Sequence, residues 1–124
     1  MSGNFLDSNV FVYLFDETSP RKRKTAESLV QKALETGDGT ISFQVVQETL
    51  NVVATKPAAP EAVRSFLESV LVPLWRVMPS QRLYERGLEI RSRYRYRFYD
   101  SLIIAAALEA GCTSLSSEDL QHGQ

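Results

Sequence analysis

Four acidic side chains stand where carboxylates from distant parts of the chain can act together. Three adjoin short apolar runs and one lies inside an apolar helical repeat; in chain order they are Asp7, Glu48, Asp100 and Asp119. Carboxylates that crowd together repel one another unless a cation neutralises them. Oxygen ligands of this kind suit Mg²⁺ or Mn²⁺, which retain water and take remaining ligands from a substrate phosphate. The set therefore predicts metal-assisted hydrolysis of a phosphodiester.

Each carboxylate also has a purely structural interpretation. Asp7 fits an Asx-turn, Asp100 fits the N-cap of a helix, and Asp119 fits a capping-box-like turn in "SSED". Glu48 fits a solvated outer helix face, although its apolar neighbours in "VVQETLNVV" would make an unpartnered charge costly. Both kinds of interpretation stay open for the four residues taken singly.

Residue types that the chain lacks narrow the chemistry further. His122 is the only histidine and lies near the end of the sequence, which argues against two-histidine acid–base catalysis and against a Ser-His-Asp triad. There is no CxxC pair and no GxxxxGK[ST] loop, which excludes zinc-finger and P-loop nucleotide hydrolase functions. Attack of metal-activated water on a phosphodiester remains.

Composition indicates one soluble globular domain. The chain has 124 residues, of which 44% are hydrophobic, and its formal net charge of -1 gives no global attraction to nucleic acid or membrane. No apolar run approaches the roughly 20 residues that span a bilayer. The single cysteine, Cys112, cannot form an internal disulfide, as is typical of proteins in a reducing cytoplasm. We expect a cytoplasmic protein in which Cys112 is a small core residue.

The elements that must position the acids alternate between strands and helices. Short strands are predicted at "NFL", "GTIS", "LWRVM" and "TSLS"; helices follow the first three, and a polar turn follows the last. Pro20 marks one helix start and Gly37 its end, while "DSLIIAAALEAG" is apolar nearly all round and predicts a central helix. This alternation predicts an α/β domain with a parallel sheet. Sites in such sheets lie beyond the carboxyl ends of the strands, where Asp7, Asp100 and Asp119 would meet.

Four stretches of the chain resemble one family in their order and spacing: "FLDSNVFVYLFD", "VVQETLNV", "FYDSLIIAAALEAGC" and "SLSSEDLQHG". Together they resemble the PIN-domain ribonucleases, and most closely the VapC-type toxins of bacterial toxin–antitoxin pairs. The similarity runs from about Asn4 to Gly123. It implies a three-layer α/β/α sandwich with a central parallel sheet and an endoribonuclease activity that depends on Mg²⁺ or Mn²⁺. It also implies inhibition by a cognate antitoxin protein and, commonly, a homodimer.

The resemblance assigns roles to individual residues. The family's acidic quartet matches the residues already singled out, Asp7, Glu48, Asp100 and Asp119. The first three would hold the metal and orient the attacking water, and Asp119 would bind a second or weaker metal position. The family's supporting polar positions match Ser8, with Asn9 beside it, and Ser117. Residues 1–124 would then form a single PIN domain that lacks the short C-terminal strand into which relatives usually continue.

Basic residues form two local clusters. "RSRYRYRFYD", residues 91–100, sets four arginines among aromatic rings directly before Asp100. Arg95 and Arg97 are the candidates for contacts with RNA phosphates, and the aromatic faces could accept bases. The alternative is a solvated helix end whose arginines pair with Glu85 or Glu89. The run from Arg21 to Lys24 fits a solvated face or an antitoxin contact better than direct RNA binding.

Three other functions compete with the ribonuclease. An aspartyl-phosphate phosphatase needs a nucleophile in a DxD loop, but Asp7 is followed by "SNV". A phosphoacceptor signalling domain needs an acidic pair near the first strand and a lysine after the last, and neither is present. A non-catalytic PIN-like module that binds RNA or protein is disfavoured by the intact acidic quartet.

Overall fold

Four short parallel strands form the sheet of the computed structural model, which describes residues 3–56 and 59–117. The strands lie in the order β3-β2-β1-β4. They are β1 (Asn4–Leu6), β2 (Gly39–Ser42), β3 (Trp75–Val77) and β4 (Ser114–Ser116). In the register of this sheet Asn4 pairs with both Gly39 and Ser114. Because all pairs are parallel, the carboxyl ends of the strands meet at one edge.

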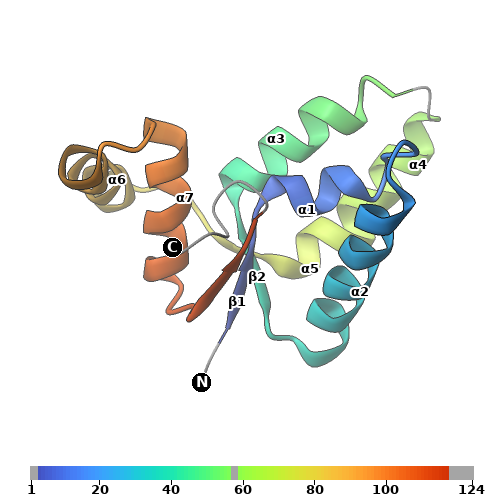
Figure 1. Ribbon diagram of the computed structural model, residues 1–124, viewed down its shortest axis with the longest axis horizontal. Helices are drawn as coiled ribbons and strands as arrows, with labels where there is room; N and C mark the ends of the chain where they lie inside the picture. The colour runs from blue at the N-terminus through green and yellow to red at the C-terminus, as the bar shows by residue number, and fades with distance from the viewer. Residues whose placement is uncertain (1–2, 57–58, 118–124) are drawn as a thin grey trace.

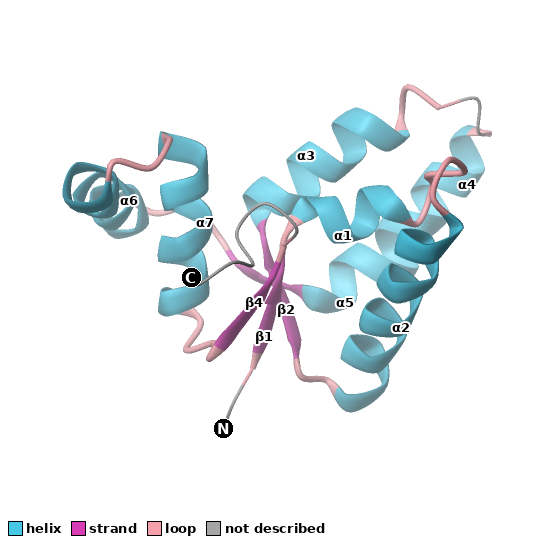
Figure 2. Ribbon diagram, in the orientation of Figure 1, coloured by secondary structure: helices cyan, strands magenta, loops and turns pink. Residues whose placement is uncertain are grey.

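Helices cover both faces of this sheet (Figure 1; Figure 2). On one side lie α6 (Gln81–Tyr94) and α7 (Phe98–Glu109). The other side carries α1 (Ser8–Tyr13), α2 (Pro20–Thr36), α3 (Phe43–Val53), α4 (Pro60–Phe66) and α5 (Val72–Leu74). The predicted α/β/α sandwich with a central parallel sheet is thus confirmed.

Both faces of the central strands are buried, as a parallel sheet between two helical layers requires. Phe5 and Leu6 are consecutive, so their side chains point to opposite faces, and both are fully buried. All four residues of β2 are buried as well. The helices on each side of the sheet therefore pack against β1 and β2, and these two strands end beside the predicted acidic site.

Local signals in the sequence place several helix ends as expected. Pro20 is the first residue of α2, and Gly37 ends that helix in the left-handed conformation with φ 70°. The helix that begins at Pro60 continues through a π-helical segment (Leu67–Leu71) into α5. We attribute the wider turn to Pro73, which lacks an N–H and whose ring would clash with a carbonyl of a regular α-helix.

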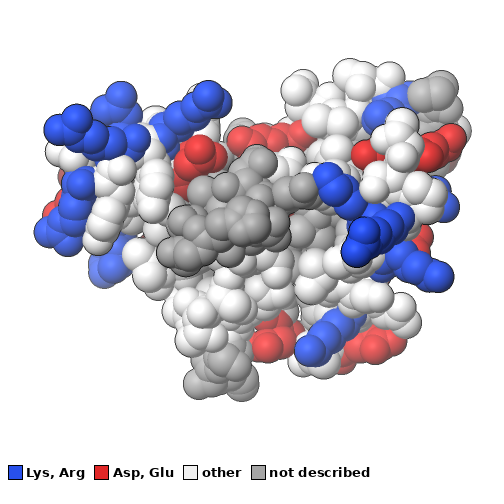
Figure 3. Space-filling view, viewed as in Figure 1, with Lys and Arg blue, Asp and Glu red and all other residues white. Residues whose placement is uncertain are grey.

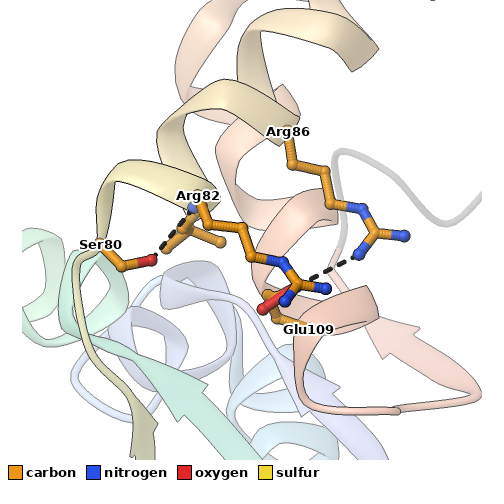
Figure 4. A network of polar contacts seen from close by, with 5 residues as sticks. Ser80, Arg82, Arg86 and Glu109 are labelled. Atoms are coloured by element: carbon orange, nitrogen blue, oxygen red, sulfur yellow. Dashed lines mark hydrogen bonds and ion pairs between the residues drawn. The ribbon is translucent and has the colours of Figure 1, made fainter.

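α6 and α7 pack closely against each other. A Cβ atom at Gly87 would lie 3.2 Å from Leu102 Cδ1, so the absent side chain permits this approach. Arg86 donates to Glu109 at 3.2 Å, and Arg82 lies 3.6 Å from the same carboxylate (Figure 4). These contacts anchor the first half of α6 to the last turn of α7.

None of the helices within the described ranges has an apolar stretch long enough to cross a membrane.

Candidate active site

Asp7 is the first acid of the site and directly follows β1. Its carboxylate caps α1, where Oδ1 accepts a hydrogen bond of 2.6 Å from the Ser8 N–H. The other oxygen, Oδ2, accepts a hydrogen bond of 2.8 Å from Ser117 Oγ. The Asp7 N–H donates to the Ser116 carbonyl, which brings the end of β4 alongside. Only 7% of Asp7 is exposed, so a buried carboxylate joins two neighbouring strand ends.

Ser8 joins Asp7 to Glu48. Its hydroxyl donates to Glu48 Oε1 at 3.0 Å and lies 3.4 Å from Asp7 Oδ1. Glu48 is half-buried on α3, which starts immediately after β2 with Ser42 as its N-cap. The solvated outer face considered for Glu48 is therefore not its environment, because hydrogen bonds hold it toward the strand ends.

Gln44 is a site residue that the sequence analysis missed. Its side-chain amide donates to Glu48 Oε2 and to the Tyr99 carbonyl oxygen, at 3.1 Å each. Tyr99 lies in the first turn of α7, so this contact brings the segment that carries Asp100 beside α3. The available signal was its position one helical turn before Glu48, on the same face of the helix.

Asp100 lies in the first turn of α7 as its third residue. The N-cap is Arg97, so the interpretation of Asp100 as an N-cap is wrong. The helix starts earlier because Arg95, with φ 62°, ends α6 and the chain turns into α7 at Phe98. The Asp100 carboxylate is half-exposed and has no hydrogen-bond or ion-pair partner among the residues that the structure describes. A negative charge here is also favourable near the amino end of the helix.

The described acids fit a hard divalent cation by their donor type. Asp7, Glu48 and Asp100 offer only carboxylate oxygens, which suit Mg²⁺ or Mn²⁺ better than metals that favour thiolate or imidazole. Within residues 3–56 and 59–117, no three Asp, Glu, His or Cys side chains are grouped closely enough to hold one metal ion. The fourth predicted ligand, Asp119, lies outside the described residues.

The arginine stretch forms an exposed corner between α6 and α7. Arg95 and Arg97 are both exposed, and the rings of Tyr94 and Tyr96 stack with centroids 5.9 Å apart. Figure 3 shows Lys and Arg side chains gathered over this side of the molecule. The alternative prediction, that the arginines of this stretch pair with Glu85 or Glu89, is not seen in the part of the chain that the structure describes. Among the described residues of α6, the ion pairs are those of Arg82 and Arg86 with Glu109.

A second basic segment lines a cavity next to Ser117. The cavity has a volume of about 430 Å³ and lies between α1, α2 and β4. Arg21 and Lys22 line it, and Lys22 Nζ lies 5.1 Å from the centroid of the Tyr13 ring. At least part of the Arg21–Lys24 run thus borders the site instead of facing only solvent.

Cys112 is not a nucleophile of this site. It packs against the hydrophobic core, as expected, and burial raises the pKa of its thiol, although a hydrogen bond with Thr40 acts in the opposite direction. The thiol is consequently protonated at neutral pH.

Comparisons with known proteins agree with this architecture. The family model of the PIN domain matches residues 5–123. Mycobacterium tuberculosis VapC20, described as a sarcin-ricin loop cleaving toxin, superposes with a TM-score of 0.66 at 21% identity, over 94% of this chain and 92% of its own. FitAcB from Neisseria gonorrhoeae superposes with a TM-score of 0.63 at 20% identity, over 91% and 86%. No curated protein sequence matches significantly. The two structures share the fold, and the family match over nearly the whole chain shows that this protein is a member of the PIN-domain family.

Proposed function

We propose that this protein is a VapC-type toxin, an endoribonuclease that hydrolyses RNA phosphodiester bonds with Mg²⁺ or Mn²⁺. The observation that carries the proposal is a continuous chain of hydrogen bonds along the carboxyl edge of the sheet. It runs through Ser117, Asp7, Ser8, Glu48 and Gln44 to the first turn of α7. Side chains from three separate segments and the backbone of a fourth thereby meet along one edge, in a chain that belongs to a nuclease-containing family.

In this proposal Asp7, Glu48 and Asp100 draw together around the metal, since their side chains as described are not grouped closely enough to hold one ion, and Asp119 holds a second or weaker position. The bound cation would supply a water molecule of lowered pKa and neutralise charge on the phosphate. The protein's own contribution is to keep the carboxylates oriented. Ser117 and the Ser8 N–H hold the two oxygens of Asp7, and the Ser8 hydroxyl holds one oxygen of Glu48. Asn9, the second residue of α1, would support the same end of the helix.

The partners proposed with this function are RNA as substrate, a cognate antitoxin protein and a second copy of the chain in a homodimer. The support is the VapC-type resemblance together with the fold shared with VapC20. An antitoxin arginine could occupy the place of the metal, because its guanidinium satisfies carboxylates bidentately. We place the protein in the cytoplasm, where such an RNA target and partner would be encountered.

Metal removal tests the proposed function directly. Purified protein is expected to cleave single-stranded RNA with Mn²⁺ or Mg²⁺ and to lose this activity in EDTA, with recovery when Mn²⁺ is restored. Product lengths on a denaturing gel measure internal cleavage. RNA binding without cleavage would favour the non-catalytic module, and metal-dependent hydrolysis of a phosphomonoester such as p-nitrophenyl phosphate, without RNA cleavage, would favour the phosphatase.

Arg95→Ala and Arg97→Ala are expected to weaken RNA binding and to leave Mn²⁺ binding unchanged. Each lost phosphate contact should reduce the slope of log affinity against log salt by about 0.7 for a single strand. Fluorescence anisotropy with labelled RNA at several salt concentrations measures this slope. Arg82→Ala is the matched control, because Arg82 is exposed at the start of α6, next to Glu109 and away from the corner formed by Arg95 and Arg97. If the wild type and the three variants have equal slopes, Arg95 and Arg97 do not contact RNA phosphates and the corner is only a solvated helix end.

A further inference from the structure

Gln44 occupies an unusual position for an uncharged polar residue. It lies in the first turn of α3, next to the carboxyl end of β2, and only 4% of it is exposed. Both of its donated hydrogen bonds lead to site elements, one to the Glu48 carboxylate and one to the backbone at Tyr99. The two partners lie 4 and 55 residues away along the chain, so one side chain ties α3 to α7.

The contacts of Gln44 determine which way its amide points. A carboxylate oxygen and a carbonyl oxygen only accept hydrogen bonds, so the NH₂ group must face both of them. The amide oxygen then faces away, and this buried atom has no hydrogen-bond partner among the residues that the structure describes. A buried acceptor without a partner is unfavourable. A methionine would fill similar space without burying an unpaired oxygen. The advantage of glutamine at this position is therefore the two hydrogen bonds that its amide donates.

Glu48 consequently receives a donor on each oxygen from a different direction. Ser8 donates to Oε1 from the start of α1, and Gln44 donates to Oε2 from within α3. Two donors restrict the rotation of the carboxylate more than one can. The second amide proton of Gln44 holds Tyr99, the residue immediately before Asp100.

We propose that Gln44 is a positioning residue that sets the placement of Glu48 relative to Asp100 by bonding the Glu48 carboxylate and the first turn of α7 with one amide. The inference rests on the proposed metal-dependent nuclease function, since it assigns Gln44 to the support of that same site. Gln44 acts through its neighbours and does not itself contact the phosphate or the metal.

Gln44→Met and Gln44→Glu test this role. Methionine keeps the length and volume but donates no hydrogen bond, and glutamate only accepts and adds a like charge one turn from Glu48. Both variants are expected to lower Mn²⁺ affinity and kcat by about 10- to 100-fold, as for other residues that orient metal ligands, with KM for RNA unchanged. Gln47→Met and Gln47→Glu are the matched controls, because Gln47 is exposed on the same helix, and they should leave all three quantities unchanged.

Hydrogen exchange in the metal-free wild type gives a readout that needs neither activity nor a variant that folds. Both side-chain amide protons of Gln44 are expected to exchange with water more slowly in NMR spectra than those of Gln47. Equal exchange rates at the two residues, or a Gln44→Met variant that matches Gln47→Met in Mn²⁺ affinity and kcat, would overturn the inference. A wild-type chain that binds no Mn²⁺ and cleaves no RNA would instead overturn the proposed function and the positioning role with it, even if the exchange rates agreed with the geometry.

Discussion

Asp100→Asn is expected to reduce metal-dependent RNA cleavage by more than about 100-fold in a protein that stays folded. Residues that only orient metal ligands cost about 10- to 100-fold when they are lost, and removing a ligand's charge should cost more. Asp100 has no protein partner in the described part of the chain, so the substitution breaks no hydrogen bond there. Cleavage assays at several Mn²⁺ concentrations measure the loss of activity and of metal affinity.

The stability of this variant separates the catalytic role from a structural one. Asp100 is not the N-cap of α7, so its only structural benefit is a negative charge in the first turn, worth about 0.3 to 1 kcal/mol. Thermal melts without metal should therefore change little. Glu109→Gln is the control acid on the same helix and should cleave RNA normally, since Glu109 contacts Arg86 at the far end. A folded Asp100→Asn protein with near-normal cleavage would remove Asp100 from the site.

Asp7→Ala is expected to abolish cleavage and to lower the free energy of unfolding by about 1.5 to 5 kcal/mol. Loss of an N-cap side chain costs about 0.5 to 2 kcal/mol. In addition, Ser117 is 5% exposed and would lose the acceptor of its hydroxyl, at a cost of about 1 to 3 kcal/mol. Urea unfolding measures the destabilisation.

Asp7→Asn is the companion variant that isolates the charge. Its amide oxygen can still cap the Ser8 N–H, and its NH₂ group can donate to the Ser117 hydroxyl, which accepts as well as donates. We expect this variant to keep most of its stability and to lose cleavage, because the metal loses an anionic ligand. Two equally stable variants would contradict the capping geometry, and an active Asp7→Asn protein would contradict the role of Asp7 as a ligand.

Most of the fold was predictable because its signals are local. The short strands predicted at "NFL" and "GTIS" appear as β1 and β2. Pro20 and Gly37 mark the ends of α2 through their own backbone preferences. The predicted start of α7 at Asp100 is too late, because aspartate is a common N-cap residue but the N-cap here is Arg97. The actual start depends on the left-handed conformation of Arg95 and on how α7 packs against α6.

By itself, the sequence determined the family, the alternation of strands and helices, and the chemical character of the site as a set of carboxylates. Which side chains hold those carboxylates was decided only by the tertiary structure. Ser8 reaches Glu48 across 40 residues, Gln44 reaches Tyr99 across 55, and Ser117 reaches Asp7 across 110. The Ser8–Glu48 and Ser117–Asp7 pairs meet because β1 lies between β2 and β4 with its carboxyl end at the same edge. Strand order arises from packing of the whole chain, whereas residue patterns report only on neighbours along it.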